Sequence, residues 1–253
     1  MAHVIAFANQ KGGVAKTTST VNLGAALREY GLRVLAVDMD PQGNLTMSQG
    51  IDTEGLEKSM YDVLVHRTPI EDVIYEREFD VAASTIDLAG AEMALAQMIG
   101  RERALQRALD PVRERYDYIL IDTPPSLGLL TINALTASEG VIVPVQCEYL
   151  SLRGLLQLEK TLEMIRENLN PDVHIQGILP TLFDARTHHG KESIEVLREN
   201  FGDLVFDTVV RKTIKCRGAR GRHLGPEVRS QRQGSRIVPR PRAGGAEWQI
   251  VLA

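Results

Sequence analysis

Residues whose types and spacing suit phosphate chemistry lie in three short stretches of this 253-residue chain. The first stretch runs from Asn9 to Thr18 and contains two lysines, two adjacent glycines and a Lys-Thr pair. Glycines let backbone N–H groups curl around phosphate oxygens, a lysine neutralises phosphate charge, and a threonine hydroxyl can ligate Mg²⁺. The stretch therefore predicts a loop that binds the phosphates of a nucleotide.

The elements on either side of this loop agree with that interpretation. Val4 to Ala8 is an apolar run typical of a buried strand, and Ser19 to Tyr30 has the apolar spacing of a helix. Strand, glycine loop and helix form the context that a phosphate-binding loop needs. The alternative is an ordinary glycine-rich turn that happens to contain Lys-Thr. We expect an ordinary backbone conformation at Ala15, so that this position requires only a small side chain.

The other two stretches place carboxylates where strands end. Asp38 and Asp40 follow the apolar run 33–37, and Asp122 ends the run 118–121 before Thr123 and two prolines. In an open α/β sheet, ligands bind at the carboxyl ends of the strands. Read alone, the first stretch could be a simple turn and the second a buried strand that ends in Asp by chance. Together with the Lys-Thr pair, they favour a magnesium–nucleotide site.

Strand and helix patterns alternate along the chain, which predicts an α/β fold. We expect a mainly parallel, twisted sheet with helices on both faces. Further strands are expected at 79–83, 141–145, 175–179 and 205–210, and further helices at 59–66, 89–109, 150–168 and 192–200. The methionines of the helix at 89–109 are expected to fill the core.

Composition restricts the classes of protein that fit. The formal net charge is −4, and the apolar and charged fractions, 43% and 25%, are those of a soluble globular protein. No apolar run approaches the ~20 residues of a membrane span, and the N-terminus has no secretory pattern. Cys147 and Cys216 are the two cysteines, and they indicate neither a disulfide framework nor a metal site. We therefore expect a protein of the reducing cytoplasm.

The combination of these motifs resembles the ParA/Soj chromosome- and plasmid-partition ATPases. Its elements are a lysine on each side of the glycine pair (the deviant Walker A pattern), Asp38 with Asp40, and Asp122-Thr123-Pro124-Pro125-Ser126. The match spans about residues 2 to 215 and defines an expected ATPase domain, 1–215. It implies a deviant P-loop NTPase fold, ATP and Mg²⁺ as cofactors, slow ATP hydrolysis and an ATP-dependent homodimer. It also implies nonspecific binding of double-stranded DNA, a ParB-type centromere-binding partner, no membrane partner and a cytoplasmic, nucleoid-associated location.

The resemblance also implies roles for single residues. Lys11 would reach the nucleotide of the other subunit, Lys16 would bind the phosphates, and Asp40 would position the attacking water. Thr17 would ligate Mg²⁺ directly and Asp122 through a water molecule. Contacts with the nucleotide are expected from Gly12, Gly13, Val14, Ala15, Lys16, Thr17, Thr18, Asp38 and Pro124, and contacts with DNA from Arg186 and Lys215.

Beyond Lys215 the family pattern stops. From Cys216 onward every Lys or Arg residue is Arg, and glycines and prolines are frequent. We expect residues 216–253 to form an irregular, disordered tail, and this composition suggests a shifted reading frame. A natural basic arm that adds DNA affinity is the alternative. Likewise, Arg186 could instead form a surface ion pair with Asp184.

Two other functions fit part of the sequence. One is a MinD-like membrane-positioning ATPase, although the tail lacks the C-terminal amphipathic helix of that branch. The other is a nucleotide- or DNA-binding module that its aberrant C-terminus has inactivated.

Overall fold

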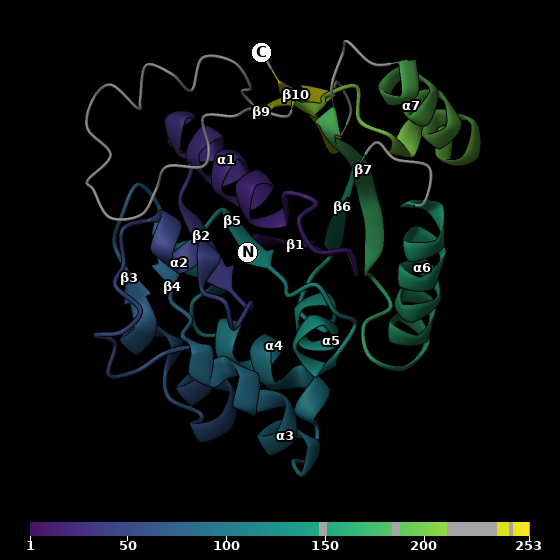
Figure 1. The fold of residues 1–253 in the computed structure, drawn as a ribbon. Helices are drawn as coiled ribbons and strands as arrows, with labels where there is room; N and C mark the ends of the chain where they lie inside the picture. Colours follow the sequence, from purple (N-terminus) through teal and green to yellow (C-terminus); the bar gives the residue numbers. More distant parts are fainter. Residues whose placement is uncertain (147–150, 184–187, 212–236, 243–244, 253) are drawn as a thin grey trace.

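An eight-stranded sheet runs through the centre of the computed structural model, and helices lie on both sides of it (Figure 1). The structure describes residues 1–146, 151–183, 188–211, 237–242 and 245–252. In spatial order the strands are β3 (Ile74–Tyr75), β4 (Asp80–Ala82), β2 (Val34–Asp38), β5 (Tyr118–Asp122), β1 (His3–Phe7), β6 (Gly140–Gln146), β7 (His174–Phe183) and β8 (Val210–Arg211). Neighbouring strands are parallel, except that β3 runs antiparallel to β4. The predicted α/β fold with a mainly parallel sheet is confirmed.

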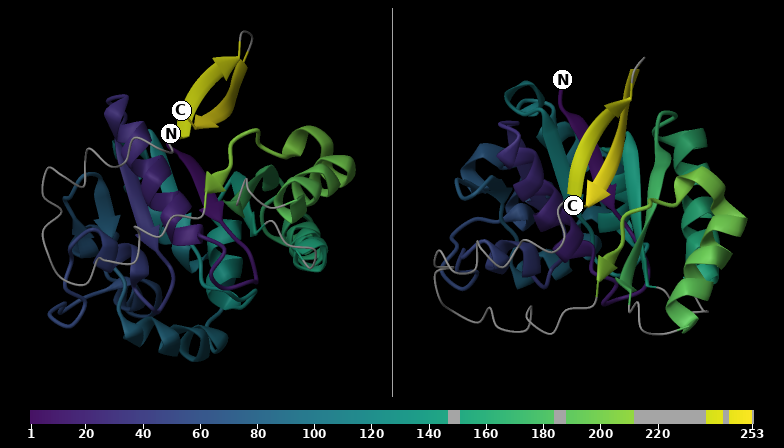
Figure 2. Two further views of the ribbon diagram at one scale, coloured as in Figure 1. Left: turned by 45° about the horizontal axis from the view of Figure 1, so that its top comes forward. Right: turned by 90° about the horizontal axis from the view of Figure 1, so that it is seen from above.

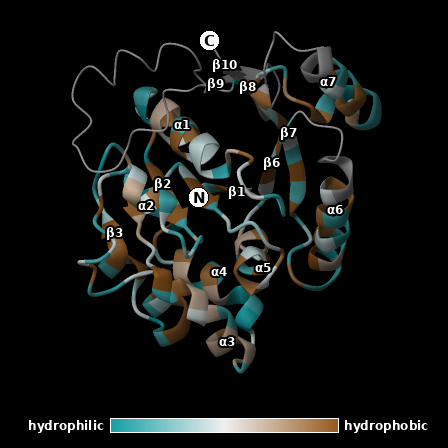
Figure 3. Cartoon of the chain, viewed as in Figure 1, coloured by the Kyte–Doolittle hydropathy of each residue, from teal (hydrophilic) through white to brown (hydrophobic). Residues whose placement is uncertain are grey.

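Two clusters of buried apolar side chains hold the helices against the sheet. Successive residues of a strand point to opposite faces, so Ile5 and Phe7 of β1 enter one cluster while Val4 and Ala6 enter the other. The cluster with Phe7 takes side chains from α1 (Lys16–Glu29) and α2 (Asn44–Ser48). The other takes them from α3 (Ala91–Ala96), α4 (Ala104–Leu109), α5 (Leu129–Thr136), α6 (Ser151–Asn168) and α7 (His188–Phe201). Figure 3 shows apolar residues recurring along the strands.

Most predicted elements are confirmed, and the exceptions have local causes. The strands at 79–83, 141–145 and 175–179 are β4, β6 and β7, and the helices at 150–168 and 192–200 are α6 and α7. At 205–210 the chain is extended only in part: Val205 bridges to Ile178, and β8 begins at Val210. The helix predicted at 59–66 is a π-helical turn, η1 (Asp62–His66). Short 3₁₀ turns connect other elements: η2 (Ile70–Val73), η3 (Ile86–Gly90), η4 (Arg101–Arg103), η5 (Arg113–Arg115) and η6 (Gly202–Leu204).

The single helix predicted at 89–109 is wrong. The structure has two short helices there, α3 and α4, with a break that contains Gly100 at φ +68°. A left-handed residue cannot continue a right-handed helix, although the apolar spacing continues across it. The expectation that the methionines there fill the core is wrong for Met93, which is 80% exposed, whereas Met98 packs against the core.

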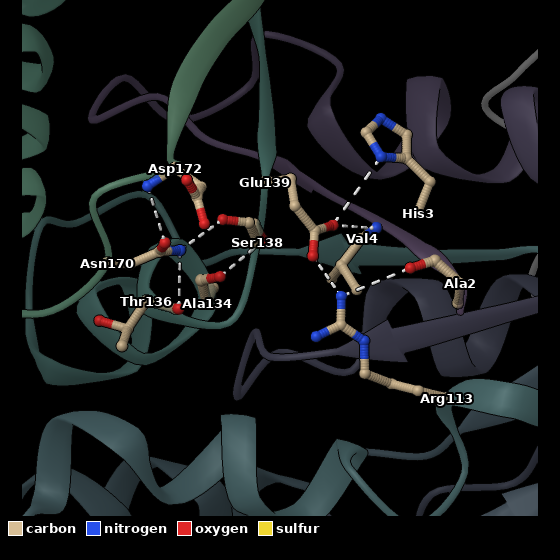
Figure 4. A network of polar contacts seen from close by, with 10 residues as sticks. All are labelled: Ala2, His3, Val4, Arg113, Ala134, Thr136, Ser138, Glu139, Asn170 and Asp172. Atoms are coloured by element: carbon tan, nitrogen blue, oxygen red, sulfur yellow. Dashed lines mark hydrogen bonds and ion pairs between the residues drawn. The ribbon is translucent and has the colours of Figure 1, made fainter. Parts of the chain in front are cut away.

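At the amino ends of the strands a polar network fixes the segment before β6 (Figure 4). The Glu139 carboxylate accepts the Val4 N–H at 2.7 Å and pairs with the Arg113 guanidinium. Next to it, the Asn170 amide donates to the carbonyls of Thr136 (2.9 Å) and Ser138 (2.7 Å). These bonds fix where β1 and β6 begin relative to each other, and therefore where the two strands end at the opposite edge of the sheet.

The tail was expected to be irregular, and its described part contains an antiparallel hairpin. Strand β9 (Ile237–Arg242) pairs with β10 (Gly245–Leu252), and neither belongs to the eight-stranded sheet (Figure 2). Pro239 and Pro241 lie in β9, which suits a strand that has one partner only. The expectations for residues 212–236 lie outside the described residues.

The loop before α1 departs from its expected backbone conformation. Ala15 has φ +66° and ψ +33°, in the left-handed region, so the expectation of an ordinary conformation is wrong. Gly13, two residues earlier, is at φ +73°. Two of the three residues 13–15 thus have left-handed backbone angles, and alanine occupies one position that favours glycine.

We therefore expect Ala15→Gly to stabilise the nucleotide-free protein. Relief of the left-handed alanine, about 1–2 kcal/mol, should exceed the added backbone entropy of glycine, about 0.5–1 kcal/mol. The free energy of unfolding in urea should rise by roughly 0.5–1 kcal/mol. The control, Ala25→Gly inside α1, should lower it by about 1 kcal/mol or more. A loss of stability in Ala15→Gly equal to that control would contradict the strain.

Candidate active site

The loop between β1 and α1 is anchored to strands β6 and β7. The Asn9 side chain donates to the Pro144 carbonyl of β6 at 2.7 Å and accepts the Lys11 N–H at 2.9 Å. From β7, the Thr181 hydroxyl donates to the Val14 carbonyl at 3.0 Å. These buried bonds hold both ends of the loop, while Lys11 and the glycine pair 12–13 remain exposed at its crest. The loop is therefore fixed in shape with an open outer side.

The first turn of α1 adds hydrogen-bond donors beside this crest. No side chain caps the start of α1, and the carbonyl of Ala15 accepts the Ser19 N–H at 2.9 Å. Helix N-termini leave N–H groups without intrahelical partners and carry partial positive charge. Thr17 and Thr18 lie in this turn, Thr17 half-buried and Thr18 exposed. A phosphate group at this point would meet backbone donors from both the loop and the helix.

Lys16 lies across the inside of the loop. Its ammonium group donates to the carbonyls of Asn9 at 3.2 Å and Lys11 at 3.5 Å, and the residue is 7% exposed. Burial lowers the pKa of Lys16, and the carboxylates of Asp122 and Asp40 act in the opposite direction. The lysine is thus held between the loop and the acidic residues of the neighbouring strands.

Asp122 supplies a buried carboxylate at the end of β5. One oxygen, Oδ2, accepts the Thr17 hydroxyl at 2.5 Å, while Oδ1 is buried and has no hydrogen-bond partner among the described residues. Burial raises the pKa of Asp122 well above its usual range, and the nearby Asp38 carboxylate raises it further. A buried carboxylate oxygen without a partner needs an explanation, and a cation or its bound water provides one.

These groups suit Mg²⁺ better than an ion held by protein ligands alone. Within the described ranges, no group of three or more His, Cys, Asp or Glu residues has the arrangement of a metal centre. Mg²⁺ usually keeps several waters and takes one or two protein oxygens, with substrate phosphates completing its shell. The Thr17 hydroxyl and the Asp122 carboxylate, next to the phosphate loop, match that donor set.

Asp38 and Asp40 lie at the end of β2, beside β5. Asp38 is directly opposite Asp122 in the parallel ladder and is fully buried. Its carboxylate accepts the Asp40 N–H at 3.2 Å, and Asp40 in turn accepts the Gln42 N–H at 3.0 Å. Burial raises the pKa of Asp38 to about 6, against hydrogen bonds from Thr46 and the Asp40 N–H that lower it. Asp40 is 8% exposed.

The segment after Asp122 packs against the loop. The Thr123 hydroxyl donates to the Phe7 carbonyl at 2.7 Å, Pro124 is buried, and a Cβ added at Gly12 would meet the Pro125 side chain at 3.8 Å. The structure thus brings together the predicted residues of the three stretches. Arg186 and Lys215, the predicted DNA contacts, lie outside the described residues, as do Cys147 and Cys216.

The sequence prediction missed three residues that support the site: Asn9, Thr46 and Thr181. Asn9 and Thr181 bond to partners 135 and 167 residues away, and no local pattern marks such pairs. Thr46 lies eight residues after its partner Asp38, in the segment that follows the predicted turn. A search for hydroxyl residues close to the acidic stretch could have found Thr46.

Asp38 makes stability depend on pH when Mg²⁺ and nucleotide are removed. Its folded pKa of about 6 exceeds the unfolded value near 3.9, so the folded state holds the proton more tightly. The stabilising contribution is complete below about pH 4 and is lost as the pH rises through 6. The stability of the wild type relative to Asp38→Asn should therefore fall by up to about 3 kcal/mol between pH 4 and 7.

Asp117→Asn is the control for this measurement. The Arg33 guanidinium lowers the pKa of the exposed Asp117, so both states are ionised above about pH 5. The stability of the wild type relative to Asp117→Asn should be constant from pH 5 to 7 in urea titrations with EDTA. A difference that is equally constant for Asp38→Asn would contradict the proton held at Asp38.

Comparison with known proteins agrees with this geometry. Residues 2–175 match the AAA domain family. The chain is 47% identical to the sporulation initiation inhibitor protein Soj of Bacillus subtilis over 256 residues, which cover 100% of this chain and 97% of Soj. It is 43% identical to the chromosome partitioning protein ParA of Myxococcus xanthus over 84% of this chain and 76% of that protein.

Solved structures show the same fold with nucleotide bound. A Mycobacterium smegmatis structure, described as cobyrinic acid a,c-diamide synthase with bound ADP and magnesium, superposes with a TM-score of 0.80 at 44% identity, over 84% of this chain and 88% of that one. A putative plasmid partition protein of Borrelia burgdorferi bound to AMPPNP has the same fold, with a TM-score of 0.73 at 24% identity over 90% and 94% of the two chains. This chain therefore belongs to the AAA domain family and, within it, to the ParA/Soj partition proteins.

Proposed function

We propose that this protein is a Mg²⁺-dependent ATPase that dimerises on ATP, binds DNA without sequence preference and drives the segregation of a chromosome or plasmid. One observation carries the chemical part: the Thr17–Asp122 pair, with its free carboxylate oxygen, lies beside the buried Lys16 ammonium at a glycine loop. Cation ligands and a phosphate-binding lysine at one point match the triphosphate of ATP with its Mg²⁺.

Each predicted residue has a role in this reaction. Lys16 and the backbone N–H groups of residues 12–17 bind the phosphates, while Thr18 and Pro124 border them. Thr17 and Asp122 would hold Mg²⁺, and that ion would supply positive charge to the phosphate oxygens. The fixed loop and its two anchors on β6 and β7 keep these donors in position before substrate binds, which avoids reorganisation during the reaction.

Asp40 orients the attacking water. One of its oxygens accepts the Gln42 N–H at 3.0 Å, which orients the carboxylate, and the residue is almost fully buried. Asp38 supports this turn through the Asp40 N–H. A carboxylate oriented in this way accepts a hydrogen bond from water and directs a lone pair of the water oxygen toward the γ-phosphorus.

Assembly and partners follow from the relatives rather than from the site. Lys11 is exposed at the crest of the loop, where its side chain could reach the nucleotide of a second subunit. Similarity to Soj and ParA supports an ATP-dependent homodimer, a ParB-type partner and nucleoid association. Arg186 and Lys215 are proposed DNA contacts because they match basic positions of that family. Among the described residues, no helix has the length and hydropathy to cross a bilayer.

Asp40→Ala and Lys16→Ala separate hydrolysis from binding. Asp40→Ala should bind Mg²⁺-ATP like the wild type but release phosphate at least about 100-fold more slowly, because only the orientation of water is lost. Lys16→Ala should fail to bind ATP.

Trapped with ATP, Asp40→Ala should bind DNA duplexes of unrelated sequence about equally. Adding Arg186→Ala should reduce the dependence of this DNA affinity on salt by about one phosphate contact.

The matched control for Asp40→Ala is Asp52→Ala. The Asp52 carboxylate accepts the N–H of the residue two positions on, at 3.1 Å, as Asp40 does, but Asp52 is exposed and outside the site. Asp52→Ala should hydrolyse ATP at the wild-type rate. Normal hydrolysis by Asp40→Ala would refute its role, and DNA binding that is independent of ATP would refute the proposed cycle.

A further inference from the structure

We propose that Thr46 is a positioning residue for ATP hydrolysis, which acts on Asp40 through Asp38. This inference rests on the proposed function and names a residue to which neither the sequence motifs nor the relatives assign a role. Thr46 lies in the first turn of α2 and is fully buried. The hydrogen bonds of its side chain go to Asp38 and Ser84, so any effect on the reaction passes through the carboxylates.

Thr46 makes three hydrogen bonds that connect two strands. Its N–H and its hydroxyl both donate to Asp38 Oδ2, at 2.9 and 2.7 Å. Its hydroxyl oxygen also accepts the Ser84 N–H at 3.0 Å, just beyond the end of β4. Donor and acceptor capacity of the hydroxyl are thus both used, one toward β2 and one toward β4.

The other oxygen of Asp38 passes this constraint on. Asp38 Oδ1 accepts the Asp40 N–H at 3.2 Å, so the Asp38 carboxylate links the hydroxyl of Thr46 to the backbone of Asp40. The Gly43 N–H donates to the Asp40 carbonyl at 2.9 Å, and a Cβ added at Gly43, which is at φ +60°, would lie only 3.2 Å from the Ser84 carbonyl oxygen. The turn that carries Asp40 is therefore linked to the segment after β4 through Asp38 and Thr46.

The geometry separates the role of the side chain from that of the backbone. If the hydroxyl is removed, Asp38 Oδ2 keeps the N–H of residue 46 but loses its shorter donor, and the Ser84 N–H loses its acceptor. The Asp38 carboxylate is then held by two backbone N–H groups alone, and the position of the Asp40 N–H is fixed less firmly. Lys16, Thr17 and Asp122 make none of these bonds, so phosphate and Mg²⁺ binding should be unaffected.

The test compares Thr46→Val, which keeps the shape without the hydroxyl, with Thr46→Ser, which keeps the hydroxyl. Thr46→Val should lower kcat for Mg²⁺-ATP by about tenfold or more, with the Kd for ATP unchanged within about twofold. Thr46→Ser should restore kcat to within about threefold of the wild type. The control is Thr161→Val, because the buried Thr161 hydroxyl donates to the Gln157 carbonyl of its own helix, at 3.1 Å, and has no other hydrogen-bond partner among the described residues.

A second readout does not depend on turnover. Hydrogen exchange of the Asp40 amide, followed by NMR in the nucleotide-free protein, should be at least about tenfold faster in Thr46→Val than in the wild type or Thr161→Val. If the wild type does not hydrolyse ATP, the proposed function fails, and this exchange still tests whether Thr46 holds Asp40.

Three results would overturn the inference: a kcat of Thr46→Val within about threefold of the wild type, a parallel loss of ATP affinity, or unchanged exchange at Asp40. If Thr46→Val does not fold, Thr46→Cys fills the same space with a weaker donor. That variant should lose at least about threefold in kcat at unchanged Kd, and a wild-type kcat would overturn the inference equally.

Discussion

Three carboxylates are buried at one edge of the sheet with a single ammonium group among them, and this imbalance of charge governs the site. Asp38, Asp40 and Asp122 lie at the ends of β2 and β5, and Lys16 faces them from the loop after β1. Buried charge is costly unless it is paired or neutralised by protons. The raised pKa values of Asp38 and Asp122 express that cost. A divalent cation bound together with nucleotide would lower this cost by neutralising the charge of the carboxylates.

The rest of the structure keeps these groups in place. The register of the parallel sheet puts Phe7, Asp38 and Asp122 side by side, and Glu139 and Asn170 fix the opposite ends of the strands. Two apolar clusters, one on each face, hold the helices against these strands. Hydrogen bonds then fix the site: those of Asn9 and Thr181 hold the loop to β6 and β7, and those of Thr46 hold Asp38. The strands thus position the charged residues, and short hydrogen bonds orient their side chains.

The sequence identified the chemistry of the site well, because its residues follow buried strands directly. Strands β1, β2 and β5 are short apolar runs, and each is followed directly by its functional stretch. The end of each strand therefore predicts where the functional residues lie. Features that depend on distant partners were not predictable. Whether Ala15 needs a left-handed backbone depends on how the loop is tied to β6 and β7, and local spacing does not reveal this. The break at Gly100 was missed for a related reason, since apolar periodicity continues from α3 into α4. The roles of Arg186 and Lys215 remain predictions.

We propose that Asp122 and Thr17 bind a Mg²⁺ ion that enters the site together with ATP. Calorimetric titration of ATP into the wild type and into Asp122→Asn, each with Mg²⁺ and with EDTA, tests it directly. Mg²⁺ should increase the affinity of the wild type for ATP by about tenfold or more, a gain of at least about 1.4 kcal/mol. Asp122→Asn should gain less than about threefold. An equal effect of Mg²⁺ on both proteins, or none on the wild type, would contradict this account of the site.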